Sequence, residues 1–166
     1  MKVRFVSILL SLCVLVLGTQ KLSAQSPDQQ FGFGFNVGSE ISGGHIAYAI
    51  SPSFHLGGLV GLNMISSSGS SVNGFVLAPY GKFLLKGSKN FVPFIMGQFV
   101  LLNGDLYKRG NDTPSFLNAS FGGEYFASKN DGVFGSINLV QLGFSPSVTT
   151  IGITTQATVG IEWFMD

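Results

Sequence analysis

The chain has 166 residues, enough for one domain, and its formal net charge is only +1. Charged residues make up 10% of it, against about 25% in an ordinary soluble domain. This composition disfavours a water-exposed surface, and the absence of a basic patch disfavours nucleic-acid binding.

The N-terminal segment is typical of a secretory signal peptide. Lys2 and Arg4 form a basic start, residues 5–17 are largely apolar, and a more polar stretch ends at Ala24, where we expect cleavage. An uncleaved anchor helix is the alternative, although the apolar stretch is short for a span of roughly 20 residues. The single cysteine lies in this stretch, so the exported part has no thiol chemistry and no disulfide. We therefore expect a signal peptide over residues 1–24 and one folded domain over 25–166.

The rest of the chain consists of short segments in which bulky apolar residues alternate with small or polar ones. In the stretch FGFGFNVG, residues 31–38, one parity is Phe or Val and the other is Gly or Asn. Because strand side chains point alternately to opposite faces, this pattern predicts strands with one apolar face. The segment at 91–102 is apolar on both parities, so its orientation stays open. The predicted strands are residues 31–41, 45–50, 54–65, 74–85, 91–102, 116–127, 133–142 and 150–164.

These eight strands predict an all-β, antiparallel up-and-down barrel that crosses a membrane. A tilted membrane-spanning strand needs about 9–11 residues, which most of the segments provide. The connections at 66–73 and 104–115 are long, and 66–73 reads as a flexible Ser/Gly loop, whereas the intervening connections are short. Short turns on one side and longer loops on the other are typical of outer-membrane barrels. An open sheet would leave unpaired edges in lipid, so we expect closure.

The chain resembles the small bacterial outer-membrane β-barrels, the OmpX-like and OmpA-transmembrane-like group. The resemblance rests on the signal segment, the Phe/Gly-rich first strand, the eight amphipathic strands and the pair Trp163–Phe164 near the C-terminus. It implies a location in the outer membrane of a diderm bacterium, with outer-membrane lipids and the barrel assembly machinery as partners. Such barrels usually end on an aromatic residue that this machinery reads, whereas this chain ends Met165–Asp166.

The ionisable residues of the strands fall on the small or polar parity. A Lys or Arg that faces lipid at the bilayer midplane costs about 2–4 kcal/mol, so this placement predicts a polar lumen and an apolar exterior. Buried charges are expected to be paired. We therefore predict that Lys82 pairs with Glu124 or Glu162, and that Glu40 faces His45 across the first outer connection. The full predicted lumen network is Glu40, His45, His55, Lys82, Glu124 and Glu162.

The favoured function is that of a non-enzymatic outer-membrane barrel with a structural or surface-recognition role. An eight-stranded interior is just wide enough to be filled by side chains, so no wide pore is expected. The connection 104–115 carries Leu106, Tyr107, Lys108 and Arg109. These aromatic and cationic groups suit an extracellular partner or an anionic lipid headgroup, so this loop is the predicted recognition site.

Two other functions remain open. A secreted, soluble, lipocalin-like barrel would turn the Phe/Leu/Val parity inward around a small apolar ligand, but its outer parity would need many Lys and Glu residues. A lipid-modifying barrel enzyme would use a Ser/His/acid arrangement near the outer rim, for which His45, Glu40 and Ser42 or Ser39 are conceivable. No His/Cys/acid cluster has metal-ligand spacing. We therefore predict no catalytic residues, no metal and no cofactor.

Overall fold

The computed structural model describes residues 31–38, 41–67, 70–107, 113–128, 130–144 and 149–165. The predicted signal peptide, residues 1–24, lies outside this part of the chain. No helix among the described residues is long and apolar enough to cross a membrane. The strands are β1 (Phe31–Gly38), β2 (Gly43–Ser51), β3 (Phe54–Ser67), β4 (Ser70–Leu84), β5 (Phe91–Asn103), β6 (Ser115–Phe126), β7 (Asp131–Phe144) and β8 (Thr149–Met165).

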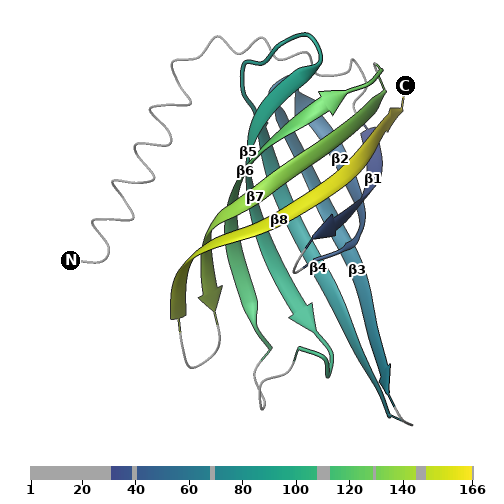
Figure 1. Cartoon of the computed structure of the whole chain (residues 1–166), viewed down its shortest axis with the longest axis vertical. Coiled ribbons are helices and arrows are strands. Elements are labelled where there is room, and N and C mark those ends of the chain that lie inside the picture. Colours follow the sequence, from purple (N-terminus) through teal and green to yellow (C-terminus); the bar gives the residue numbers. More distant parts are fainter. Residues whose placement is uncertain are drawn as a thin grey trace, which may run out of the picture.

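The eight strands form a closed barrel in which each pairs antiparallel with its neighbours in sequence (Figure 1). The seam between the first and the last strand closes it, from Phe31 opposite Met165 to Gly38 opposite Thr158. This architecture confirms the predicted eight-stranded antiparallel up-and-down barrel. Below, the turn end is the end where β1 begins, β8 ends and the connections between β2 and β3, β4 and β5, and β6 and β7 lie; the loop end is the opposite one.

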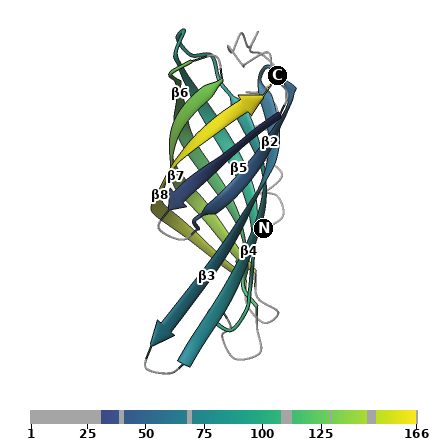
Figure 2. The same ribbon diagram turned by 90° about the vertical axis from the view of Figure 1, so that its right-hand side faces the viewer.

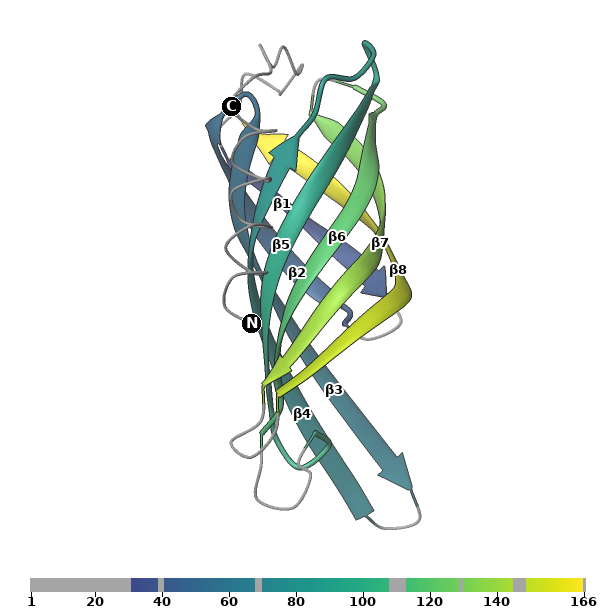
Figure 3. The same cartoon turned by 90° about the vertical axis from the view of Figure 1, so that its left-hand side faces the viewer.

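The β3–β4 hairpin corrects one expectation. The sequence predicts a flexible loop over residues 66–73, but the strands continue through most of it, with Ser66 opposite Ser71 and Ser67 opposite Ser70. A ladder of backbone hydrogen bonds needs no particular side chain, and this stretch holds no proline to interrupt it. The two strands consequently extend beyond the rest of the barrel at the loop end (Figures 2 and 3).

Large apolar side chains face outward on every strand. In β5, whose orientation the sequence leaves open, Phe91, Ile95 and Phe99 face outward while Val92 and Phe94 are buried. The outer wall is therefore apolar, whereas a soluble barrel needs a polar outer wall. Outward-facing representatives of the eight strands are Phe33, Ile46, Leu56, Leu77, Ile95, Phe121, Ile137 and Val159, each at least 38% exposed.

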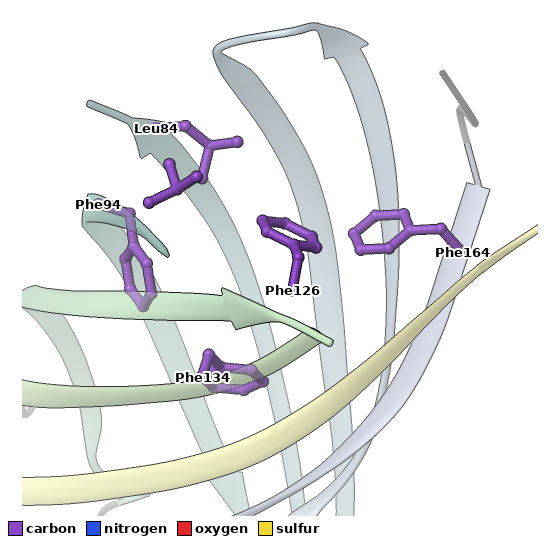
Figure 4. Close-up of a cluster of buried hydrophobic side chains, with 6 residues drawn as sticks. Leu84, Phe94, Phe126, Phe134 and Phe164 are labelled. Atoms are coloured by element: carbon purple, nitrogen blue, oxygen red, sulfur yellow. The ribbon is translucent and has the colours of Figure 1, made fainter. Parts of the chain in front are cut away.

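The interior is filled in layers. At the turn end, apolar side chains project from β4 to β8 into the barrel (Figure 4). A second apolar group lies toward the loop end, against Leu102, Tyr107 and Phe116. The polar lumen residues lie between the two groups. The turn-end cluster is Leu84, Val92, Phe94, Phe126, Phe134 and Phe164, and the loop-end cluster is Ile41, Leu59, Val76, Ala78 and Val100.

Candidate functional site

A buried ion triad crosses the lumen beside the turn-end cluster. Lys82 on β4 donates from Nζ to Glu124 Oε2 on β6 at 2.9 Å and to Glu162 Oε2 on β8 at 2.5 Å. The lysine is 2% exposed and the two carboxylates are 0% and 1% exposed. All three side chains lie on the inward parity of their strands, within a few residues of the turn end. Lys82 therefore contacts both of the carboxylates that the sequence offers as alternative partners.

Glu162 is the centre of this network. Besides the lysine, its Oε1 accepts a hydrogen bond from His45 Nε2 at 3.1 Å and one from the Tyr80 hydroxyl at 3.4 Å. The Nζ atom of Lys82 also lies 5.5 Å from the ring centroids of both Phe94 and Phe134, within the range of cation–π attraction. The network thus joins β2, β4, β6 and β8.

A glycine makes the contact between His45 and Glu162 possible. In the sheet register, Gly34 on β1 stands directly between His45 on β2 and Glu162 on β8. A β-carbon at this position would lie 2.7 Å from His45 Cε1 and would collide with the carbonyl oxygen of Ile161. The bare inward face of β1 therefore provides the space through which its two neighbours interact.

Other inward glycines make room in the same way. A β-carbon at Gly132 would collide with Glu124, one at Gly57 with the Tyr80 ring, and one at Gly160 with the Phe134 ring. The sequence pattern places Gly57 and Gly160 only on the small parity of their strands, and it places Gly132 in a turn before the predicted strand 133–142. The signal that was missed is that small residues inside a narrow barrel leave space for large side chains from neighbouring strands.

The remaining predicted lumen residues lie elsewhere. His55 is fully buried and stands opposite Lys82 in the β3–β4 register. Its ring packs against Phe164 with 5.8 Å between centroids, which places it on the side of the turn-end cluster. Glu40 lies outside the described residues, so its predicted position facing His45 stays a prediction.

A chamber with a mixed wall adjoins the triad, and its apolar wall residues are Ile41, Leu59, Met96 and, from the turn-end cluster, Phe94 and Phe134. It is a cavity of about 50 Å³, which is room for several water molecules or a ligand of a few heavy atoms. His45, Tyr80, Lys82 and Glu162 form part of its wall. The other polar wall residues are Asn36, Gln98, Asn118, Ser120, Asn138, Gln156 and Thr158.

In the predicted recognition loop, the described residues fold back onto the barrel. The Leu106 N–H donates to the Asn73 carbonyl at 3.2 Å, and the Tyr107 hydroxyl accepts a hydrogen bond from the Asn63 amide. Tyr107 also packs against the loop-end cluster. Lys108 and Arg109 lie outside the described residues.

The conceivable catalytic group is not assembled by the residues that the structure describes. Ser42 Oγ donates to the Gly38 carbonyl at 3.4 Å and accepts from the Gly38 N–H at 3.2 Å, while His45 is bonded to Glu162. Ser39 and Glu40 fall outside the described part. Within that part, no three His, Cys, Asp or Glu side chains are grouped so that they would hold a metal ion.

Comparisons with known proteins identify no family. No family model matches the chain, and no curated protein matches it. Among solved structures, the N-terminal β-barrel domain of Pseudomonas aeruginosa OprF is similar at 14% sequence identity and a TM-score of 0.49, over 82% of this chain and 96% of that one.

Proposed function

We propose that the protein is a non-enzymatic β-barrel of the outer membrane, with a structural or surface-recognition role and no wide pore. The observation that carries this proposal is the distribution of side chains across the barrel wall. Large apolar side chains cover the outside of all eight strands, whereas Lys82, Glu124 and Glu162 are buried inside.

The physical argument compares water and lipid as surroundings for the apolar outer wall of the barrel. Monomeric soluble proteins rarely expose contiguous apolar patches larger than a few hundred Å², and here the apolar surface encircles the barrel. In lipid, that surface is in its preferred solvent, and closure of the sheet satisfies the backbone hydrogen bonds that lipid cannot satisfy. This contrast also favours the membrane over the soluble, lipocalin-like alternative.

The filled interior supports the absence of a wide pore. The turn-end cluster includes four phenylalanines at 9% exposure or less, Phe94, Phe126, Phe134 and Phe164. The loop-end cluster fills the opposite side next to β3, β4 and β5, and the chamber between the two clusters is small. The function then lies at the surface: in contacts with outer-membrane lipids, and in recognition through the outer loop with Lys108 and Arg109. Assembly of such a barrel would use the barrel assembly machinery.

A charge placed on the outer wall tests the membrane proposal. Phe121 lies in the middle of β6 between Ile95 and Ile137, and the matched control, Tyr125, lies near the turn end of the same strand. In lipid vesicles we expect Phe121→Arg to lower the free energy of unfolding by about 2–4 kcal/mol and Tyr125→Arg by about 0–1 kcal/mol. Urea titration of the vesicle-inserted barrel measures both values.

The opposite result has a clear meaning. In a water-soluble barrel, Phe121→Arg would replace an exposed apolar side chain with a charged one at little cost. A wild-type chain that stays soluble without detergent, together with a Phe121→Arg variant of unchanged stability, would refute the membrane assignment.

A further inference from the structure

Two amide oxygens in the chamber have no hydrogen-bond donor among the described residues. Asn36 Oδ1 and Asn118 Oδ1 both belong to side chains that line the cavity, and these residues are 8% and 5% exposed. A buried acceptor without a donor is costly, because it has given up its hydrogen bonds to water and gained none in return. Such atoms therefore indicate a place that donor groups of water or of a ligand occupy.

The charges at the base of the chamber are already engaged with one another. Lys82 donates to both carboxylates, and Glu162 accepts from Lys82, His45 and Tyr80. An anionic ligand would approach these carboxylates and the two unpartnered oxygens, while a cationic one would approach the lysine. The chamber thus disfavours anions, and a neutral polar molecule can donate to the two unpartnered oxygens without disturbing the ion triad.

The rest of the wall defines the chemistry of that molecule. Five side-chain amides and two hydroxyls surround the cavity, and they offer both donors and acceptors. A hydroxyl group donates one hydrogen bond and accepts others, so it complements such a wall and also supplies the donors that Asn36 and Asn118 lack. The cavity of about 50 Å³ limits the ligand to a small compound.

The chamber lies close to the loop end where the barrel wall is shortest. Asn36 is near the end of β1, and the pairing of β1 with β8 stops at Gly38 opposite Thr158. Beyond this point β8 continues to Thr149 with β7 as its partner. Figures 2 and 3 show how much further β3 and β4 extend than β1 and β2. A polar group entering from the loop end has its shortest path to Asn36 and Thr158 on this side.

We propose that the chamber is a binding site for a small neutral polyol of about the size of glycerol. Its hydroxyls donate to Asn36 Oδ1 and Asn118 Oδ1 and accept from the neighbouring amides. The same glycerol group occurs as a free solute and as the head of a lipid, and the chamber recognises the chemistry that both share.

Nuclear magnetic resonance of the folded barrel in detergent tests the site with free glycerol as the probe. We expect saturable shifts of the Asn36 and Asn118 side-chain amide signals. The Asn118→Leu variant, which removes the acceptor at similar volume, should bind glycerol roughly tenfold more weakly. Asn63→Leu is the matched control, because Asn63 is a lumen amide on β3 outside the chamber wall, and its affinity should equal that of the wild type.

Each outcome decides the proposal. If the wild-type signals show no saturable shift with free glycerol and none with phosphatidylglycerol, the chamber holds water only and the proposal is overturned; the same follows if Asn118→Leu binds as tightly as Asn63→Leu. If Asn118→Leu fails to fold, Asn36→Leu makes the same comparison. A second arm uses phosphatidylcholine nanodiscs with and without phosphatidylglycerol. Shifts with free glycerol identify a solute site, and shifts that appear only with phosphatidylglycerol identify a headgroup site.

Discussion

The ion triad predicts a specific pattern of stability loss. Lys82→Met keeps an unbranched side chain but removes the positive charge between Glu124 and Glu162. Both carboxylates are almost fully buried. Breaking a buried ion pair in this way costs about 3–5 kcal/mol. This is a large part of the 5–15 kcal/mol by which a folded protein is typically stable. The barrel should therefore unfold at a markedly lower urea concentration.

The structure also predicts which of the two carboxylates accounts for most of the stability lost in Lys82→Met. After removal of the lysine, Glu162 keeps its hydrogen bonds from His45 and Tyr80. Glu124 has Lys82 as the donor to Oε2, and no donor among the described residues reaches its Oε1. In the Lys82→Met background, Glu124→Gln should therefore recover more stability than Glu162→Gln, because it neutralises the less supported charge.

Equilibrium urea unfolding in lipid vesicles, followed by tryptophan fluorescence and by heat-dependent electrophoretic mobility, measures these differences. Lys86→Met is the control, because Lys86 is exposed in the connection between β4 and β5 and its replacement should change stability by no more than about 0.5 kcal/mol. A loss below about 1 kcal/mol in Lys82→Met, or a larger recovery from Glu162→Gln than from Glu124→Gln, would refute the reasoning.

Two further predictions concern the space in the lumen. Gly34→Ala places a methyl group between His45 and Glu162 and should lower the free energy of unfolding by about 1–3 kcal/mol through overpacking. Gly44→Ala is the control and should cost much less, because a β-carbon at Gly44 would have its nearest neighbour at 3.6 Å. Urea unfolding compares the two variants, and equal losses would contradict the spacer role of Gly34. Planar-bilayer recordings of the wild-type barrel should show no stable wide-pore conductance, and sustained stepwise currents would contradict the filled interior formed by the turn-end and loop-end clusters.

Side-chain alternation made most of the fold predictable. A period of two identifies a strand and its two faces at the same time, so the Phe31–Gly38 stretch predicts both a strand and a bare inward face. The inward parity of Lys82, Glu124 and Glu162 followed from the same rule. Two parts of the fold escaped it. β5 is apolar on both parities, and only its neighbours in the closed barrel determine that Phe94 points inward. The serines at the tip of the β3–β4 hairpin pair through their backbone, which composition does not reveal.

The sequence predicted which residues lie in the lumen better than it predicted which of them contact one another. His45 and Glu162 are 117 residues apart, and they meet because β8 closes onto β1 and Gly34 leaves space between them. A local pattern does not contain the register of that closing seam. The sequence therefore identified His45 as a lumen residue without predicting Glu162 as its partner. It also identified no chamber, because a cavity depends on which side chains from distant strands lie at the same level of the barrel.

The contacts of the ion network depend on the register of the strands that contribute to it. His45, Lys82, Glu124 and Glu162 come from β2, β4, β6 and β8, so each odd-numbered strand has a contributing strand on either side. A slip of one residue in a strand turns all its side chains to the other face. For β4, such a slip would move Lys82 away from Glu124 and Glu162 to the apolar outer face, where no carboxylate faces it among the described residues. The same slip would leave two buried carboxylates without a cation. A well-packed apolar core of equal volume would stabilise the barrel as much or more, but it would not penalise wrong registers so heavily. The observed register is the one in which Lys82 reaches both Glu124 and Glu162.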